Sequence, residues 1–253
     1  MRWIRTCLTT AVAGAVAGNI LWGAIVDNSA NAQKFVPKNR GLPGRREGGG
    51  TRGACLNSKG TLTAVMPINN AGLTTTSHPT FSWYVPETQP TLAEFVLLDR
   101  NDQEIYQSTF QVSGKAGIIS LTLPKTTTMM ALQPDQQYRW KFAIACDSND
   151  ASNDMLTEGW VERIKPSTEL QAKLSGKSPS EQAALYAAEG IWYDAAAILA
   201  DLRRTQPTAE SQTRWQSLLG SVDLTNLATE PLFPKEEATT QGDSPIGHSK
   251  IDR

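Results

Sequence analysis

The chain is poor in the residues on which most enzymes rely for nucleophilic and metal chemistry. Its 253 residues include two histidines, His78 and His248, and three cysteines. A nucleophile triad needs a histidine beside an activated serine, and nothing near His78 marks such a serine. A zinc site would need both histidines to converge with Cys55 and Cys146, which conflicts with a disulfide between these cysteines. We therefore expect a protein that is not an enzyme and that holds no cofactor and no metal.

An excess of charge of one sign is also missing, because 24 basic residues balance 25 acidic ones. This balance does not favour nucleic acid, and we expect no such partner. The long apolar run, Leu8 to Val26, follows Arg2 and Arg5 and precedes Ala30-Asn31-Ala32. These features predict a signal peptide over residues 1–32, export to the periplasm or the exterior, and no membrane span after cleavage. The alternative is an uncleaved anchor, since the run approaches spanning length.

Cysteine use follows from this prediction. Cleavage near Gln33 removes Cys7 and leaves Cys55 and Cys146. In an oxidising compartment we expect these two to form a disulfide. The bridge would close a loop of roughly 90 residues, for which the chain-entropy model gives at most about 4 to 5 kcal/mol of stabilisation. Two separate buried thiols are the alternative.

Residues 33–53 form a basic arm that is rich in glycine, and its charged side chains are basic except for Glu47. Such a composition buries too little apolar surface to offset ordering, so we expect mobility at least up to Arg46. Its second half, GRREGGGTRGAC, can also turn backbone amides toward an anion, with Arg45, Arg46 and Arg52 as charged donors. A flexible or packing arm and an anion contact both stay open.

Residues 54–166 have the pattern of an antiparallel β-sandwich, because short runs rich in Thr, Val, Ile and aromatics alternate with turn residues. In the run Thr80–Val85, Trp83 is the candidate for the central core aromatic. The predicted strands are Leu62–Met66, Thr80–Val85, Ala93–Asp99, Glu104–Gln111, Gly117–Leu123, Gln137–Cys146 and Gly159–Lys165.

The segment LQPDQQYRWKFAIAC, residues 132–146, gives the clearest local prediction. A bend at Pro134 precedes Tyr138 and Trp140, which open an alternating strand. This arrangement is typical of a tyrosine corner, in which the tyrosine hydroxyl bonds to backbone upstream. We predict that Tyr138 and Trp140 belong to the structural core.

After Pro166 the period of the apolar residues changes from two to about 3.6, which predicts helices. Ser178 and Glu181 form a capping box for the first predicted helix. Trp192 lies on the apolar face of the second helix and is assigned to the core. We expect an α-helical subdomain over 167–225 and a disordered tail over 226–253, with helices at 178–189, 191–205 and 208–221.

Two further patterns suggest ligands. The acidic stretch at residues 147–154 offers oxygen ligands for calcium, but it lacks the glycine and glutamate of an EF-hand loop, and its residues are ordinary in loops. Trp192, Tyr193 and Asp194 suggest sugar stacking. Helical spacing directs Trp192 inward and leaves Tyr193 and Asp194 freer to face outward, so core packing is the better interpretation of Trp192.

Local motifs resemble known folds. Residues 79–83 together with Leu132, Pro134, Tyr138 and Trp140 resemble strands of fibronectin type III sandwiches. Tyr186, Gly190, Trp192, Ala195 and Pro207 are spaced as in one tetratricopeptide unit. The predicted class is therefore α+β, with an immunoglobulin or fibronectin III-like sandwich followed by a tetratricopeptide-like helical hairpin and a third helix.

The chain as a whole resembles a cyanobacterial family of exported proteins of unknown function. The resemblance covers about residues 44–220 and rests on GRREGGGTRGAC at 44–55, Pro79-Thr80-Phe81, Tyr138-Arg139-Trp140, Cys146-Asp147 and residues 190–194. It implies export and a shared architecture, and it supplies no catalytic residues. We expect a non-catalytic binding or scaffold module of the cell envelope with a protein or polysaccharide partner. The alternative is a protein that binds a polyanion or membrane surface through the basic arm.

Overall fold

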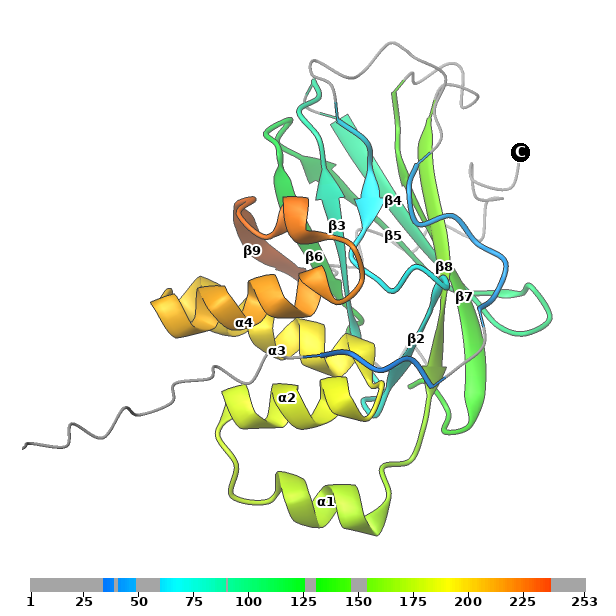
Figure 1. The fold of residues 1–253 in the computed structure, drawn as a ribbon. Coiled ribbons are helices and arrows are strands. Elements are labelled where there is room, and N and C mark those ends of the chain that lie inside the picture. The colour runs from blue at the N-terminus through cyan, green and yellow to red at the C-terminus, as the bar shows by residue number, and fades with distance from the viewer. Residues whose placement is uncertain are drawn as a thin grey trace, which may run out of the picture. The chain divides into compact units, whose positions relative to one another are not determined.

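The computed structural model describes residues 34–38, 41–48, 60–89, 91–125, 131–146 and 154–237, all within one compact unit. The fold is α+β: two mixed β-sheets are followed along the chain by four helices, and a last strand joins the smaller sheet (Figure 1). The strands are β1 (Thr63–Ala64), β2 (Ala71–Thr74), β3 (Thr80–Val85), β4 (Thr91–Leu98), β5 (Glu104–Val112), β6 (Gly117–Thr122), β7 (Gln136–Ile144), β8 (Met155–Arg163) and β9 (Leu232–Glu237).

The two sheets share the strands unevenly. One sheet has the order β1-β3-β6-β9 and the other the order β2-β8-β7-β4-β5. Neighbouring strands are antiparallel except for two pairs, β2 with β8 and β6 with β9, which are parallel. Sequence-adjacent strands such as β3 and β4 thus lie in different sheets, and β4 and β5 form a hairpin within one of them.

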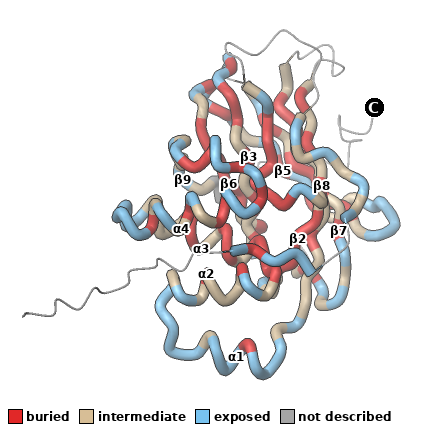
Figure 2. Tube along the Cα trace, viewed as in Figure 1, coloured by how far each residue is buried: buried red, intermediate tan, exposed pale blue. Residues whose placement is uncertain are grey.

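The space between the sheets is filled by aromatic rings. Along β3 every second side chain is buried, and Trp83 is fully buried there. The Trp83 ring stacks on Phe142 of β7 with centroids 4.1 Å apart, and it meets Trp140 edge-on at 5.7 Å. Each such pair contributes about 1 kcal/mol beyond its area burial. Figure 2 shows this buried region running through the strands.

Tyr138 forms the bond that the corner motif predicts. Its hydroxyl accepts a hydrogen bond from the backbone N–H of Gln133 at 2.9 Å. Nearby, the Arg163 guanidinium donates to the carbonyls of Leu132 and Thr75. The bend before β7 is therefore held by side chains from two strands of the same sheet.

The helices follow their capping signals. They are α1 (Thr168–Leu174), α2 (Pro179–Ala188), α3 (Trp192–Thr205) and α4 (Ala209–Gly220), with a 3₁₀ turn η2 at Thr225–Leu227. The predicted capping box is present, because the Ser178 hydroxyl accepts from the Glu181 N–H and the Glu181 carboxylate accepts from Ser178. The prediction missed α1, a short helix whose N-cap, Ser167, accepts from Leu170 N–H at 3.1 Å.

The helical segment shares the core of the sheets and is not a separate subdomain. Helix α3 contacts β2, β3 and β9, and Trp192 and Tyr193 belong to the same buried cluster as the sandwich aromatics. The Trp192 indole N–H donates to the carbonyl of Val65 at 2.9 Å. A boundary at residue 166 therefore divides one hydrophobic core, because the largest side chains of α3 face the sheets.

The described part of the basic arm is packed, which corrects the expectation of mobility. Phe35 is buried and meets the Trp192 ring edge-on at 5.0 Å. Val36 N–H donates to Ala187 O at 3.2 Å, so the arm crosses the turn between α2 and α3. Gly190 in this turn has φ +74°, and a Cβ there would lie 2.6 Å from Val36 O. The arm has few apolar residues, and among its described residues Phe35 is the one that is buried.

The tail prediction also needs correction, because residues 226–237 are ordered in η2 and β9. Leu232 and Phe233 pack against the core, and the Phe233 ring lies where a Cβ on Gly117 would be 2.6 Å away. Strand β9 pairs with β6 in parallel, an order that only the tertiary fold provides. The strand was not predicted because its sequence, LFPKEE, lacks the alternation of apolar and polar residues that indicates a strand. Residues 238–253 lie outside the described residues.

Candidate functional site

Two of the three arginines predicted as an anion contact, Arg45 and Arg46, lie within the described residues. The Arg46 guanidinium donates to the carbonyl of Val222 at 2.7 Å and lies 3.9 Å from the Glu47 carboxylate, and its side chain is 10% exposed. Arg45 forms an isolated bridge with Glu158 through its backbone. Arg52 lies outside the described residues. Arg46 thus ties the arm to the end of α4, and its guanidinium is occupied inside the fold.

The predicted disulfide is only half within the described residues. Cys146 follows β7 and is half-buried, and its N–H donates to the Asp154 carboxylate at 2.9 Å. Cys55 lies outside the described residues, so its pairing with Cys146 stays a prediction. Most of the acidic stretch considered for calcium, residues 147–153, also lies outside them.

His78 lies in the turn before β3. Its Nδ1 is 2.8 Å from the Ser77 hydroxyl. Burial, followed by the charges of Lys125 and Arg163, lowers the pKa of His78. Among the residues that the structure describes, no group of three or more His, Cys, Asp or Glu side chains could hold a metal ion.

Tyr193 and Asp194 are enclosed, which corrects the expectation that they face outward. The Tyr193 hydroxyl accepts from the Trp140 indole N–H at 2.8 Å and donates to Trp160 O at 3.0 Å. Burial raises the pKa of Tyr193. Because the ring also meets Phe81 at a centroid distance of 5.1 Å, it has no free face for stacking on a sugar.

Asp194 joins the first turn of α3 to the end of β2. Its carboxylate accepts from the hydroxyl of Thr74 at 2.6 Å and from both the hydroxyl and the N–H of Thr75. Burial raises the pKa of Asp194, although these hydrogen bonds oppose the shift. This carboxylate is a structural tie between helix and sheet.

Replacing Asp194 should therefore change both the stability of the fold and the dependence of that stability on pH. Asp194→Ala leaves the donors of Thr74 and Thr75 unpaired and should lower the free energy of unfolding by about 2 to 4 kcal/mol. The raised pKa means that the folded state binds more protons than the unfolded state above the usual carboxyl pKa. Wild-type stability relative to Asp194→Asn should therefore fall as pH rises from about 4 through the folded-state pKa. Urea denaturation across this pH range measures both, and a constant difference would contradict the assignment.

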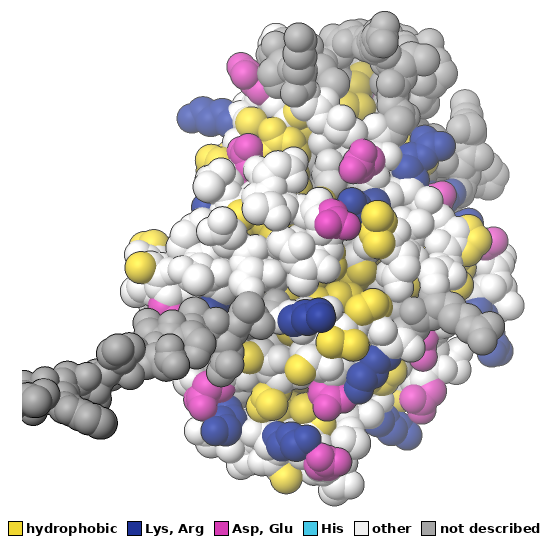
Figure 3. Space-filling model, viewed as in Figure 1, with side chains coloured by type: hydrophobic (Ala, Val, Ile, Leu, Met, Phe, Trp, Pro, Cys, Tyr) yellow, Lys and Arg dark blue, Asp and Glu magenta, His cyan; other side chains and the backbone are white. Residues whose placement is uncertain are grey.

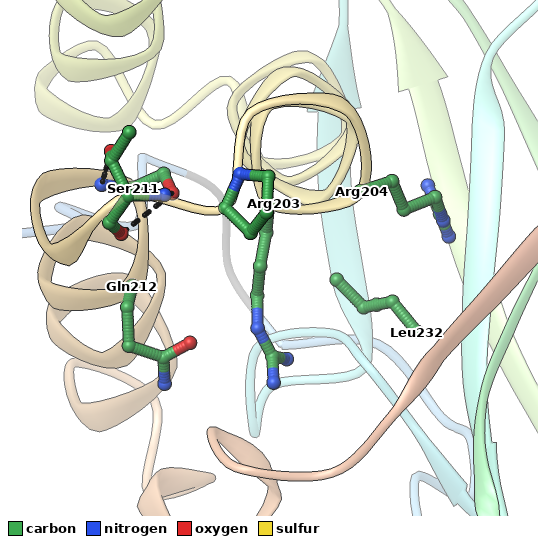
Figure 4. Close-up of a pocket in the computed structure, with 7 residues that line it drawn as sticks. Arg203, Arg204, Ser211, Gln212 and Leu232 are labelled. Carbon is green, nitrogen blue, oxygen red and sulfur yellow. Dashed lines mark hydrogen bonds between the residues drawn. The ribbon is translucent and has the colours of Figure 1, made fainter.

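A pocket of about 400 Å³ lies where the end of α3, the start of α4 and β9 meet. Figure 4 shows Arg203 and Gln212 extending in the same direction from α3 and α4, while Arg204 points to the side of the sheet. Its lining residues are Arg203, Arg204, Pro207, Thr208, Ser211, Gln212 and Leu232. Pro207 ends α3, and Thr208 caps α4 with its hydroxyl, so the loop between the helices is fixed.

The two arginines of the pocket differ in their bonding. Arg204 donates to Phe233 O at 2.7 Å, to the Ser120 hydroxyl at 2.5 Å and to Asp201 at 3.1 Å. Arg203 has a buried guanidinium nitrogen, Nη1, with no hydrogen-bond partner in the described part of the chain. Burial lowers the pKa of Arg203, and the charge of Glu230 opposes this shift. Arg203 still carries its charge at neutral pH, because an arginine pKa lies far above it.

The remaining groups of the pocket are polar and fixed. The Gln212 amide donates to Ala228 O at 3.0 Å, and its carboxamide oxygen lies on the side of Arg203 (Figure 4). The first turn of α4 adds the partial positive charge of a helix N-terminus. The pocket therefore combines a cationic side chain, whose Nη1 has no hydrogen-bond partner in the described residues, with polar groups that are already oriented, which suits a small anion.

Two other hollows offer less. One, of about 510 Å³, lies at the tyrosine corner, but Gln133 and Gln137 there already bond Ala131 O and Glu162. The other, of about 320 Å³, places Glu47 and Glu230 together beside hydroxyl groups. On the face in Figure 3, basic and acidic side chains are interspersed. The α3–α4 pocket is thus the better candidate.

Sequence reasoning missed this pocket. Arg203 and Arg204 end an amphipathic helix, where basic residues are ordinary because they interact with the helix dipole. The only available signal was that one of two adjacent arginines must lie near the buried face of α3. The third lining element, β9, was not predicted at all. In the described ranges no helix is long and apolar enough to cross a membrane.

The sequence was compared with curated proteins and with protein-family profiles. No curated protein matches the sequence. A family profile matches residues 47–232, which include both cysteines of the predicted disulfide and every residue that lines the α3–α4 pocket. Arg45 and Arg46 lie just before the matched region. The chain therefore belongs to the family described as Domain of Unknown Function (DUF928).

Proposed function

We propose that this protein is an exported, non-catalytic binding module of the cell envelope that captures a carboxylate-bearing sugar of an acidic polysaccharide in the α3–α4 pocket. The observation that carries the proposal is the unpaired, buried Nη1 of Arg203. A buried charged donor without an acceptor costs stability, and a ligand carboxylate removes that cost.

The surroundings of Arg203 favour a singly charged ligand. The charge of Glu230 acts on Arg203 and would repel a doubly charged phosphate more than a carboxylate. Thr208 and Gln212 line the same pocket and suit the hydroxyl groups of a sugar ring. A pocket of about 400 Å³ is large enough for one such ring.

The binding step is tested by titration with D-galacturonate, with D-galactose as the uncharged match and inorganic phosphate as the doubly charged one. We expect saturable binding of galacturonate, measured by calorimetry, and weaker binding of the other two. Arg203→Gln should reduce the affinity at least about tenfold, since hydrogen bonds to charged groups contribute about 1.5 to 3 kcal/mol. Arg214→Gln is the matched control, because Arg214 lies on α4 and pairs with Glu210 at its surface. Equal affinity in both variants would refute the pocket as the site.

We infer further that the sandwich is of the immunoglobulin or fibronectin III type. The order of its strands supports this, because β3 and β6 pair in one sheet while β4, β7 and β8 form the other, as strands B, E, C, F and G do in that fold. The Tyr138 hydroxyl bond before β7 supports it as well. The pairing of α2 with α3 across Gly190 is compatible with a tetratricopeptide-like hairpin. Both scaffolds commonly serve binding.

Export is part of the proposal and has its own test. Residues 1–32 fused to a phosphatase that is active only after export should give activity outside the cytoplasm. The exported chain should migrate differently with and without reductant if Cys55 and Cys146 are paired. A cytoplasmic, inactive fusion would contradict export and leave the carboxylate site to be judged by the titration.

The alternative, a polyanion contact through the basic arm, has less support. It needs Arg45, Arg46 and Arg52 to present their charges together, whereas the Arg46 guanidinium bonds Val222 O. Retention on an anionic resin that is lost in Arg45→Ala/Arg52→Ala but kept in Arg203→Gln would favour the arm over the pocket.

A further inference from the structure

The outer edge of β5 differs from the other sheet edges of this fold. In the described residues β5 pairs with β4 alone, so no described strand occupies the other edge of its regular part, Tyr106 to Val112. Its sequence, EIYQSTFQV, contains no proline, glycine or lysine, and its single charge, Glu104, lies at the start. Edge strands normally avoid pairing with another chain through prolines, bulges or charged residues, above all lysine, and β5 has none of these beyond its first residues.

The other three edges carry such devices. Strand β1 has two residues, and the arm bonds beside it, as in Gly48 N–H to Leu62 O at 2.6 Å. Strand β2 has four residues, and α3 packs against it. Strand β9 contains Pro234, and its Lys235 pairs with Asp201 of α3 at 2.5 Å. The contrast singles out β5 as an open edge.

The bulge at the start of β5 does not close this edge. The register shifts between Leu97 and Leu98, opposite the first residues of β5. From Tyr106 to Val112 the pairing with β4 is regular, and exposure alternates between buried and open positions. Within this regular part the Phe110 side chain is on the face of β5 that packs on the core, and its ring centroid lies 6.2 Å from that of Phe142. It is nevertheless only partly buried.

We propose that this edge pairs with the same edge of a second copy, in antiparallel orientation, to make a continuous sheet across a dimer. The strand is complementary to itself: an axis at Ser108 places Tyr106 of each copy opposite Phe110 of the other, an aromatic cross-strand pair on the inner face.

The interface is small, so the dimer is weak. One edge-to-edge pairing lies at the low end of protein interfaces, and we expect a dissociation constant of about 10 µM or more. Sedimentation equilibrium of the chain without residues 1–32 should show dimer growing with concentration. Hydrogen exchange of the β5 amides should slow over the same range.

Charge at the exposed position Thr109 tests the pairing directly. Thr109→Lys and Thr109→Glu should each weaken the dimer by at least about tenfold, because each new charge lies opposite Gln107 of the other copy and diagonally across the axis from its like-charged counterpart. An equal mixture of the two should recover the wild-type affinity, which a folding defect would not do. Gln137→Lys is the matched control, since Gln137 is exposed on the central strand β7.

Four results would overturn the proposal. The wild type could stay monomeric at every concentration, or the dimer could survive both Thr109 variants. The charge-complementary mixture could fail to associate. Protection of the β5 amides could also be independent of concentration, which would mean that something other than a second copy occupies the edge.

Discussion

Trp192→Ala should lower the free energy of unfolding by about 3 to 5 kcal/mol, the range for removing a large aromatic from a packed core. Trp192 is fully buried, its indole N–H bonds Val65 O at 2.9 Å, and Phe35 of the arm lies against its ring. The substitution removes the ring that joins the arm, α3 and the sheets. The loss should therefore appear in all three parts at once.

The measurement is urea denaturation followed both by helical circular dichroism and by hydrogen exchange of amides in β3. Coincident transitions, shifted together, are expected for one core. Trp160→Ala serves as the control, because Trp160 is only partly buried and its indole N–H donates to Pro43 O at 2.7 Å, so its loss should cost less than that of the fully buried Trp192. Separate transitions for helices and sheets would restore the boundary at residue 166.

Much of the sandwich could be predicted from periodicity because a strand with one buried face alternates in its side chains. Strand β3 has the predicted bounds, and β7 differs by one or two residues at its ends. Helices α2 and α3 were found from a capping box and from an apolar face. In each case the decisive information is local in the sequence.

The elements that were missed depend on distant partners. Strand β2 has four residues, AGLT, and exists because it pairs in parallel with β8. Strand β9 pairs with β6, more than 100 residues earlier in the chain. No local pattern distinguishes such segments from loops, since a short strand has no propensity that outweighs its entropy without a neighbouring strand.

The candidate site was beyond sequence reasoning for the same reason. Arg46 and Arg203 are both arginines in polar surroundings, yet the first bonds Val222 O and the second has an unpaired nitrogen. Likewise Asp194 was expected to face outward, and the threonines that bond it are the last residue of the unpredicted β2 and the residue after it. Which polar side chain is free depends on packing between segments far apart in the sequence.

Gly72→Val should be among the most damaging single substitutions, with a loss of about 3 kcal/mol or more in the free energy of unfolding. A Cβ on Gly72 would lie 2.7 Å from Cε2 of Tyr193 and 3.2 Å from Cβ of Trp192. The Tyr193 ring cannot yield, because hydrogen bonds to Trp140 and Trp160 hold its hydroxyl. Helix α3 would have to move away from β2 as a whole, which also breaks the bonds of Asp194.

Two further variants would distinguish close packing from backbone conformation as the reason why Gly72→Val is destabilising. Gly176→Ala changes a glycine with φ +71° and no atom within 4 Å of the added Cβ, so it should cost only about 1 to 2 kcal/mol of backbone strain. Tyr193→Leu removes the ring that Gly72 touches, and combined with Gly72→Val it should recover part of the loss through a favourable coupling energy. If the two substitutions prove additive in denaturant unfolding, the contact between β2 and α3 is not what requires glycine at this position, and the close packing of α3 on the sheet edge loses its main support.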